Sequence, residues 1–496
     1  MGKKIVVIGS GVAGLSTASF LAKAGHQVTL LEKNETIGGR ARKFEVDGYV
    51  FDMGPSWYWM PDVFERFYQQ FGYSSSDFYE LKRLSPSYKV FWKDGSNDNV
   101  PADLNEFKAW FEKLEPGSAS KLDKFLEEAA YKYEVGINDL VHKPSLNIME
   151  FADVRIATGV FKMHLFSSFS KYIRKYFKHP KIIELLEFPV LFLGAMPKDT
   201  PALYSLMNYA DIKLGTWYPM GGMHKIIEAF EKIAIEQGVS INTNSEVVKF
   251  IYENNEIISV EDVNGNTFEA DVVVSGADYE HTDQTLAKGK SNYSKDYWNS
   301  RLMAPSSLLF YLGVNKRVEN LLHHNLFFDE DFNQHAVEIY KNPTWPSKPL
   351  FYACVPSKTD PSVAPDGHEN IFLLVPLAPD LEDSDEMREK YFDIILTRLE
   401  QKTGQSVREH ITYKRSYCLS DFKQDYHAYK GNAYGLANTL RQTAFLKPKL
   451  KSKKIANLYY TGQLTTPGPG VPPSIISGEV VAKEVMKAIQ EPALTV

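Results

Sequence analysis

Apolar and polar positions fall in blocks over the first thirty residues of the chain. Ile5–Ile8 is a continuous apolar run, which is typical of a parallel strand buried on both faces. Ala13–Ala24 carries helix-forming residues with an apolar stripe, Gly25 ends it, and Val28–Leu31 is a second apolar run. This order predicts a strand–helix–strand unit at the start of the chain.

Further along, helical and strand patterns occupy separate regions. Residues 60–240 are largely helical in pattern, and two more helices are predicted over 384–403 and from Ser474 to about Ile489. Short apolar runs bounded by turn residues predict the strands. These strand segments are Val239–Asn242, Glu246–Tyr252, Ile257–Val263, Val272–Ser275, Ser307–Leu312, Leu350–Val355, Ile371–Val375 and Leu458–Thr461.

The length of 496 residues exceeds what one hydrophobic core usually serves, so two or three domains are expected. We predict an α/β protein with a Rossmann-like dinucleotide-binding domain assembled from discontinuous segments, 1–70 with about 238–285 and 450–496. A mixed-sheet substrate domain is expected from about 85–150 and 286–449, and a helical, membrane-facing portion from about 151–237.

A glycine-rich turn joins the first predicted strand to the first helix. Gly9 permits the tight turn, Gly11 lets the backbone approach a pyrophosphate, and Gly14 lets the helix pack on the strand. The start of that helix presents free N–H groups to the phosphates. Glu32 ends the second strand where an acid accepts ribose hydroxyls, and it disfavours a 2′-phosphate. The motif therefore predicts FAD or NAD and argues against NADP.

Two other segments distinguish FAD from NAD. Small residues in segments 38–42 and 51–56 would let the chain pass close to an extended cofactor beyond its pyrophosphate, and Arg40 or Arg42 could reach a phosphate. An ordinary surface turn is the alternative interpretation for Gly38 and Gly39. Residues 461–473 form a Gly/Pro-rich loop that leads into a helix. The dipole of that helix would face the flavin edge that gains negative charge on reduction, and a rigid structural loop is the alternative. Together the two segments favour FAD.

The sequence therefore predicts an FAD site built from both ends of the chain and a middle segment. The residues expected to bind the cofactor are Gly9, Gly11, Val12, Ala13, Gly14, Glu32, Lys33, Gly39, Arg40, Gly54, Pro55, Ser56, Val247, Gly462, Gln463 and Val471.

Several segments resemble motifs of the bacterial phytoene-desaturase-type carotenoid desaturases. They are Gly9–Gly14, Glu32, Gly38–Arg42, Phe51–Trp57, Trp217–Met223, Pro356–Pro365, Gly431–Leu436, Gln442–Ala444 and residues 461–478. The N-terminal motifs belong to a wide flavoprotein superfamily that includes amine oxidases, whereas the segments at 217–223 and 467–472 are more particular. The resemblance covers the chain essentially end to end. One departure is Gln463, which stands where many relatives carry an acid.

The resemblance implies an enzyme that converts CH₂–CH₂ units of a long linear isoprenoid, such as phytoene, into double bonds. FAD would accept the hydride, and oxygen or a quinone would reoxidise the flavin. Asp153 and Arg155 lie roughly where relatives place an acid and an arginine, and a helix-capping acid is the alternative for Asp153. Trp57, Tyr58 and Trp59 follow the flavin-proximal segment, where they either stabilise transient positive charge or pack between domains.

Composition narrows the environment of the protein. A net charge of −6 argues against nucleic acid as the main partner. Cys354 and Cys418 are the only cysteines and share no metal or redox spacing, so we expect a reducing compartment and no metal site. No apolar stretch is long enough to span a membrane.

Residues 155–181 form a basic, aromatic stretch without any acidic residue. Aromatic and aliphatic side chains recur at helical spacing, which suits a helix lying on anionic headgroups. The alternative is an amphipathic helix that faces the protein core and exposes a basic face. We expect a cytoplasmic protein peripherally associated with the inner face of the cell membrane, because a lipid-like substrate comes from a bilayer.

Several other functions share part of this pattern. A later-acting carotenoid desaturase, a saturase or a carotenoid isomerase would share most motifs. A flavin amine oxidase would share residues 5–56, but the Pro/Gly run near the C-terminus disfavours it. A non-enzymatic prenyl-lipid carrier on the same scaffold would need no intact flavin site, and both flavin-facing segments are intact here.

Overall fold

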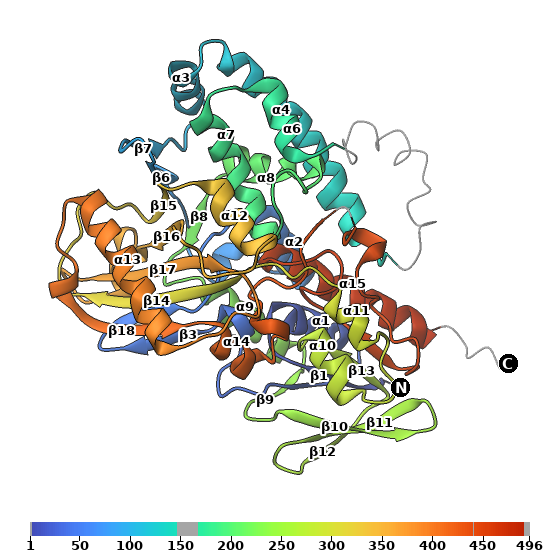
Figure 1. Cartoon of the computed structure of the whole chain (residues 1–496). Coiled ribbons are helices and arrows are strands. Elements are labelled where there is room, and N and C mark those ends of the chain that lie inside the picture. Colours follow the sequence, from blue (N-terminus) through green and yellow to red (C-terminus); the bar gives the residue numbers. More distant parts are fainter. Residues whose placement is uncertain (1, 146–166, 440, 491–496) are drawn as a thin grey trace.

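A five-stranded parallel sheet joins the two ends of the chain in the computed structural model, which describes residues 2–145, 167–439 and 441–490. The strand order is β19-β13-β1-β2-β9, and every neighbouring pair is parallel. The strands are β1 (Lys4–Ile8), β2 (Gln27–Leu31), β9 (Ser240–Asn242), β13 (Val272–Ser275) and β19 (Leu458–Tyr460). This confirms the predicted Rossmann-like unit, and Figure 1 shows its N-terminal and C-terminal segments side by side.

Both faces of this sheet are covered, as its continuous apolar strands require. The helices α1 (Val12–Lys23), α9 (Lys225–Glu236) and α15 (Val471–Gln490) cover one face, where Ile5 and Val7 join their hydrophobic cluster. Val6 and Ile8 point to the other face, toward an antiparallel sheet of three strands. Those strands are β10 (Val247–Glu253), β11 (Glu256–Asp262) and β12 (Thr267–Glu269).

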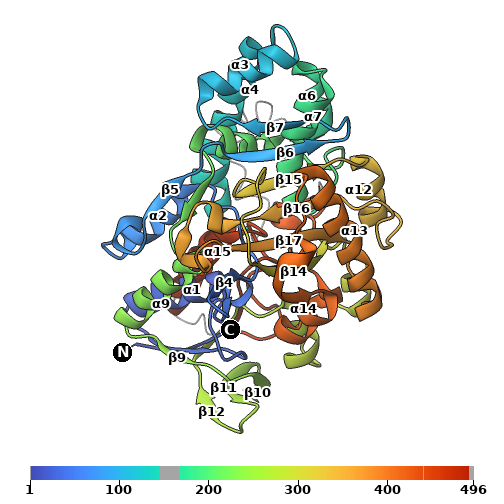
Figure 2. The same ribbon diagram turned by 90° about the vertical axis from the view of Figure 1, so that its left-hand side faces the viewer.

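The second large element is a seven-stranded mixed sheet with the order β18-β14-β17-β16-β15-β6-β7. Only the β15–β6 pair is parallel. Helix α13 (Asp385–Thr403) covers one face of this sheet, and the opposite face joins the cluster that includes the parallel sheet (Figure 2). The strands are β6 (Tyr88–Trp92), β7 (Asn97–Val100), β14 (Ser306–Val314), β15 (His324–Phe328), β16 (Phe351–Cys354), β17 (Glu369–Leu377) and β18 (Ile411–Tyr417).

Short elements connect these sheets. The two-stranded sheets are β3–β4 and β5–β8, built from β3 (Lys43–Val46), β4 (Tyr49–Asp52), β5 (Leu81–Arg83) and β8 (Trp217–Pro219). The remaining helices here are α2 (Pro61–Gln70), α10 (Tyr279–His281), α11 (Lys295–Asn299), α12 (Phe332–Tyr340) and α14 (Leu419–Tyr426). The mixed sheet is confirmed, and the domain boundaries stay a prediction.

A helical portion lies at the end of the molecule opposite β10–β12 in both views (Figures 1 and 2). It contains α3 (Leu104–Leu114), α4 (Ser118–Tyr133), α6 (Phe169–Tyr176), α7 (Pro180–Glu187) and α8 (Leu206–Tyr209). None of the helices within the described ranges is long and apolar enough to cross a membrane.

The described part of the predicted membrane helix turns its apolar stripe inward. Phe169, Tyr172 and Ile173 are each at most 1% exposed and belong to the main hydrophobic cluster, where Tyr172 packs with Phe125 of α4. Amphipathic spacing predicted α6 correctly, but these side chains cover the protein core and form no lipid-facing surface. The basic side chains of this helix are exposed.

Candidate cofactor and substrate site

The glycine turn between β1 and α1 is tightly packed at Gly14 and has open space at Gly11. A Cβ added to Gly14 would collide with the carbonyl oxygen of Gly9, so α1 packs on the turn only because this residue is glycine. A Cβ added to Gly11 would meet no atom within 4 Å. Gly11 caps α1 without any side-chain hydrogen bond, which leaves the first N–H groups of the helix free for an anion.

Glu32 lies at the end of β2 beside this turn and is 4% exposed. Its Oε2 accepts hydrogen bonds from the backbone N–H (2.8 Å) and hydroxyl (2.6 Å) of Ser10, and its Oε1 accepts from the backbone and side chain of Asn34 (both 2.9 Å). The carboxylate thus holds the turn in shape, and a ribose hydroxyl would share its oxygens with these donors.

The second glycine segment packs directly against the first. A Cβ on Gly39 would lie 3.1 Å from the Cα of Gly11, and the N–H of Gly38 donates to the carbonyl of Ser10 at 3.1 Å. Gly54 lies against the backbone of Arg40, where a side chain would collide. The segments predicted from 9–14, 38–42 and 51–56 therefore form one continuous surface.

Two arginines of this surface differ in how their charge is balanced. Arg42 pairs with Asp425 at 2.5 Å, and its Nη2 donates to the hydroxyl of Tyr426 at 3.2 Å. Arg40 stacks over Tyr426 at 4.9 Å, and its hydrogen bond to the carbonyl of Asn432 is long, at 3.4 Å. Burial lowers the pKa of the Arg40 guanidinium, whose Nε has no partner among the residues that the structure describes. A buried cation in this state fits a phosphate of the cofactor.

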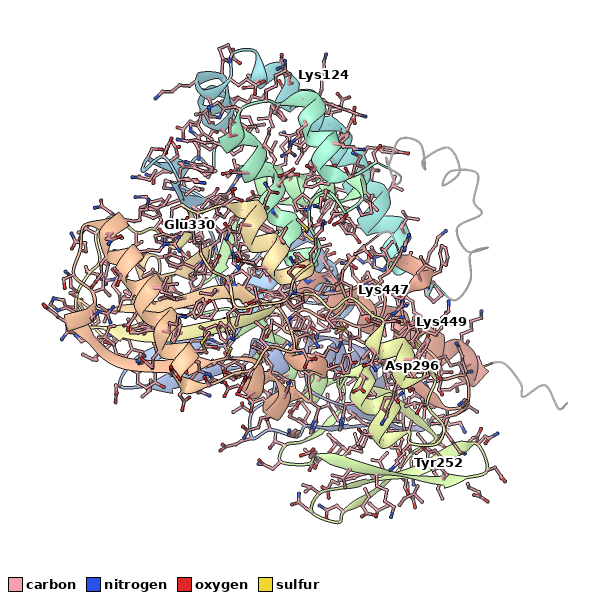
Figure 3. The ribbon with its side chains drawn as sticks, viewed as in Figure 1. Lys124, Tyr252, Asp296, Glu330, Lys447 and Lys449 are labelled. Atoms are coloured by element: carbon pink, nitrogen blue, oxygen red, sulfur yellow. The ribbon has the colours of Figure 1, made fainter. Side chains whose placement is uncertain are left out.

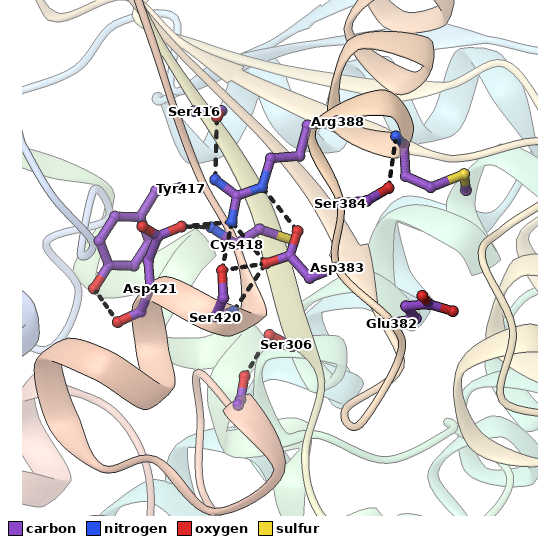
Figure 4. Close-up of polar contacts among 12 residues, drawn as sticks. Ser306, Glu382, Asp383, Ser384, Arg388, Ser416, Tyr417, Cys418, Ser420 and Asp421 are labelled. Carbon is purple, nitrogen blue, oxygen red and sulfur yellow. Dashed lines mark hydrogen bonds and ion pairs between the residues drawn. The ribbon is translucent and has the colours of Figure 1, made fainter.

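A polar network holds α14, which supplies Asp425 and Tyr426. Figure 4 shows Arg388 of α13 between two carboxylates: it donates to Asp383 at 2.6 and 2.8 Å and to Asp421 at 2.7 Å. Burial opposes ionisation of Asp383, but the hydrogen bonds from Arg388 lower the pKa of Asp383 to about 2. Through this network, the mixed sheet and α13 position the partners of Arg42.

The C-terminal loop reaches the same surface. The N–H of Gly462 donates to the hydroxyl of Ser477 at 2.9 Å, and a Cβ on Gly462 would lie 3.8 Å from the Cβ of Ala13. Gln463 donates to Asn432 at 3.4 Å. The loop leads directly into α15, as the sequence predicted, but the helix begins at Val471, three residues before the predicted start at Ser474.

The other predicted cofactor residues surround this centre. Val12 and Ala13 begin α1 and are buried, and Val247 shares a hydrophobic cluster with Leu31 at the end of β2. The amine of Lys33 donates to the carbonyl of Gln424 in α14. Pro55 continues the turn after Gly54, and Ser56 accepts a hydrogen bond from Tyr352 at 3.1 Å. The predicted catalytic residues Asp153 and Arg155 lie outside the described residues.

An apolar cavity of about 90 Å³ lies on the inner face of the mixed sheet. Its walls come from β15–β17 and α12, with contributions from before and after these elements. The lining residues are Phe188, Pro305, Leu326, Phe328, Phe332, His335, Ala336, Ile339, Tyr340, Leu350, Phe351, Tyr352, Leu374, Pro376 and Tyr434. None of these side chains is a carboxylate, an ammonium or a guanidinium, so the wall of the cavity suits an apolar ligand.

The histidine in this cavity is held neutral. Nδ1 of His335 accepts from the N–H of Leu350 at 3.0 Å, and Nε2 donates to the carbonyl of Pro376 at 2.9 Å. Burial lowers the pKa of His335 to about 4. Its two ring nitrogens are thus occupied by backbone groups, and it offers no free base to a ligand.

A smaller cavity of about 20 Å³ adjoins the flavin-proximal segment and is lined by residues that include Gly54, Ser56 and Cys354. Tyr352 connects it to the apolar cavity, because its hydroxyl donates to Ser56 and accepts from Nδ1 of His324 at 2.7 Å. A wall residue of the apolar cavity therefore contacts the segment that the sequence assigned to the flavin.

The three aromatic candidates for charge stabilisation have different positions. Trp57 stacks on His324 with ring centroids 4.0 Å apart. Tyr58 is fully buried and its hydroxyl contacts that of Tyr79 at 3.0 Å, and Trp59 donates to Thr216 at 2.8 Å. Tyr58 and Trp59 therefore pack between elements, which was the alternative interpretation.

Sequence reasoning missed the acids that connect distant motifs. Asp52 accepts the backbone N–H groups of Met223 and His224 at 2.7 and 2.9 Å, and Asp360 accepts that of Gly221 at 2.5 Å. These bonds explain why the 51–56, 217–223 and 356–365 motifs occur together. No local pattern marks these acids, because their partners lie more than one hundred residues away.

Comparison with known proteins places these motifs in context. A carotenoid 3,4-desaturase of Haloarcula japonica is 43% identical over 490 residues, which cover 98% of this chain and 99% of that protein. A zeta-carotene-forming phytoene desaturase of Myxococcus xanthus is 29% identical, covering 98% and 94%. A 4,4'-diapophytoene desaturase of Staphylococcus haemolyticus is 30% identical, covering 98% and 99%.

Solved structures share the fold at low sequence identity. An oxidoreductase from Methanosarcina mazei superposes with a TM-score of 0.64 at 16% identity, covering 98% of this chain and all of that one. Putrescine oxidase bound to putrescine superposes with a TM-score of 0.61 at 12% identity, covering 98% and 99%.

The family model for flavin containing amine oxidoreductases matches residues 12–486. This match confirms the predicted cofactor, FAD, which the open turn at Gly11 and the unpaired Nε of the buried Arg40 among the described residues also fit. The chain belongs to the flavin containing amine oxidoreductase family.

Proposed function

We propose that this protein is an FAD-dependent desaturase that introduces double bonds into a linear carotenoid. The apolar cavity beside the flavin-proximal segment carries this proposal, because no side chain on its wall would pair with a charged substrate such as an amine. The named relatives act on carotenoids, and their similarity extends over 98% of the chain.

FAD supplies a hydride acceptor when bound. Gly11 and the start of α1 would receive the pyrophosphate, with Arg40 as its counter-charge and Glu32 beside the ribose. The cavity walls position the polyene and exclude water. Asp153 and Arg155 remain the proposed pair at the reacting carbons, from the resemblance alone.

Phytoene and a later intermediate are both candidate substrates. The identity of 43% to a carotenoid 3,4-desaturase, against 29% and 30% to the desaturases named for phytoene and diapophytoene, favours a later-acting enzyme. Expression in two hosts separates them: cells that accumulate phytoene, and cells that accumulate an already conjugated linear carotene.

Each added double bond shifts the absorption of the pigment to longer wavelength. A shift only in the second host would identify a later-acting enzyme, and a shift in the first host would identify a phytoene desaturase. A Leu374→Trp variant, which fills the cavity, is the matched control and should bind FAD but leave the pigments unchanged. Unaltered pigments in both hosts would contradict the proposed function.

We also propose that the protein docks on the inner face of the cell membrane and that oxygen or a quinone reoxidises the flavin. Lys171, Arg174, Lys175 and Lys178 are exposed on and after α6, where they suit anionic headgroups. Co-sedimentation with anionic liposomes should fall when all four are changed to Glu. Retained binding would show that this face is not the anchor.

A further inference from the structure

Lys447 is a buried lysine whose amine has no partner in the part of the chain that the structure describes. It follows the turn Ala444–Leu446 and is 2% exposed. The amine points at the C-terminal loop, because a Cβ placed on Gly468 would lie 2.8 Å from its Nζ. Figure 3 labels Lys447 in the middle of the molecule in that view.

Two further polar atoms around this loop lack partners among the described residues. They are Oδ1 of Asn438, which would lie 3.3 Å from the same Cβ on Gly468, and Oγ1 of Thr466. Buried polar groups in native proteins nearly always have a hydrogen-bond partner, so three such atoms at one loop indicate a polar ligand. A buried unpaired amine is the most costly of the three.

Lys447 and the phosphate end of the cofactor site lie at opposite ends of the C-terminal loop. Asn432 contacts both Arg40 and Gln463, near the start of the loop. Six residues later along the same segment, Asn438 contacts Gly468, near the end of the loop. Because Arg40 marks the phosphate end, Lys447 and Asn438 mark the opposite end, next to the start of α15.

The surroundings of Lys447 set its charge. Burial alone lowers the pKa of Lys447 to about 7, and no charged neighbour contributes. The titratable groups on the elements around it are Tyr204, whose hydroxyl contacts Thr443 at 3.4 Å, and Lys449, whose amine donates to the carbonyls of Ser145 and Phe445. Negative charge arriving at this loop would therefore draw a proton to Lys447.

We propose that Lys447 takes up a proton beside the flavin when the substrate is oxidised, with Asn438 and Thr466 completing the same polar site. This role of Lys447 rests on the proposed function as an FAD-dependent desaturase. Each double bond formed removes one hydride and one proton from neighbouring carbons: the hydride goes to FAD, and the proton converts the Lys447 amine into an ammonium. The ammonium then offsets the negative charge gained at this end of the cofactor, and it releases the proton when oxygen or a quinone reoxidises the flavin.

A redox titration of the purified, FAD-loaded protein without substrate tests this inference. The midpoint potential of a two-electron couple falls by about 30 mV per pH unit for each proton taken up. We expect the wild type to fall by about 60 mV per unit above pH 7, because Lys447 and the flavin each gain a proton. A slope of about 30 mV in the wild type between pH 7 and pH 9 would overturn the proposal.

Variants assign the second proton to this residue. In Lys447→Met, the midpoint potential should fall by about 30 mV per pH unit. At pH 8 the equilibrium should favour the reduced flavin at least tenfold less than in the wild type, which corresponds to a midpoint potential lower by about 30 mV. Lys447→Arg keeps the charge fixed and should also give about 30 mV per unit. Lys454→Met removes an exposed lysine of the same segment and should match the wild type. A two-proton slope in either Lys447 variant would overturn the assignment.

The redox titration tests the role of Lys447, and the pigment assay tests the proposed substrate, so either can be refuted without the other. A two-proton slope that depends on Lys447 supports this inference even in a protein that leaves carotenoids unchanged, which would refute the proposed substrate instead. Carotenoid desaturation by a protein with a one-proton slope would overturn the inference and leave the proposed function intact.

Discussion

Gly11 and Gly14 differ in the space around them, so replacing each by alanine tests cofactor binding and folding separately. At Gly14 the new methyl group would collide with the carbonyl oxygen of Gly9 and lie 3.1 Å from its carbonyl carbon, and both atoms belong to backbone. At Gly11 the methyl group would enter open space within the protein itself. The backbone at Gly11 has φ −63°, which any residue can adopt.

Gly14→Ala should therefore lower the free energy of unfolding, whereas Gly11→Ala should lower the affinity for FAD. Overpacking at position 14 should destabilise the cofactor-free protein by about 1–3 kcal/mol or more, because α1 must shift against β1. At position 11 the free energy of unfolding without FAD should stay within about 0.5 kcal/mol of the wild type. If the pyrophosphate occupies the open space, Gly11→Ala should weaken FAD binding at least tenfold, about 1.4 kcal/mol.

Urea denaturation of the cofactor-free proteins and titration with FAD measure the two quantities separately. In saturating FAD, the Gly11→Ala protein should also lose up to about 1.4 kcal/mol of the stabilisation that bound cofactor gives, since that gain follows the logarithm of the dissociation constant. An unchanged dissociation constant for Gly11→Ala would refute the placement of the phosphate. Equal destabilisation of both cofactor-free variants would refute the packing argument.

Three further changes test other parts of the structure. Arg42→Met removes the cation that pairs with the half-buried carboxylate of Asp425 and leaves it the hydrogen bond from Tyr417. The change should cost about 1–3 kcal/mol of stability, whereas an unchanged urea midpoint would show that the ion pair is dispensable. Ala336→Phe should obstruct the apolar cavity and lower desaturation at least tenfold while FAD content stays constant; full activity would place the substrate elsewhere. Burial raises the pKa of Asp211 to about 7, so its ionisation destabilises the fold as the pH rises from about 4 to 7. Asp211→Asn should therefore gain stability relative to the wild type over that interval, by at most about 4 kcal/mol, and parallel pH profiles would contradict this.

Much of the fold followed from local sequence patterns. Continuous apolar runs identified β1, β2, β13 and β19, since a parallel strand covered on both faces needs no polar side. The helix predicted over 384–403 is α13, with Ser384 as its N-cap. Strand ends were less accurate: β14 extends to Val314, two residues beyond the prediction.

For the predicted membrane helix, the spacing of apolar residues did not reveal what covers its apolar face. Helical spacing identifies an apolar face but not what covers it, and a core and a bilayer attract the same side chains. Here Phe169, Tyr172 and Ile173 are buried within the protein, and Tyr172 packs against Phe125 of α4. Only the tertiary structure distinguishes the two cases.

The sequence by itself determined the dinucleotide unit, its preference for FAD and the family, because turn glycines, a strand-end acid and a helix start act over short distances along the chain. Only the tertiary structure decided which distant side chains meet: Arg42 with Asp425, Asp52 with Met223, and Lys447 with the loop at Gly468. Such pairs arise when separate segments pack together, and no local periodicity encodes them. The chemistry of the site depends on these meetings, because burial and charge balance are properties of the assembled fold.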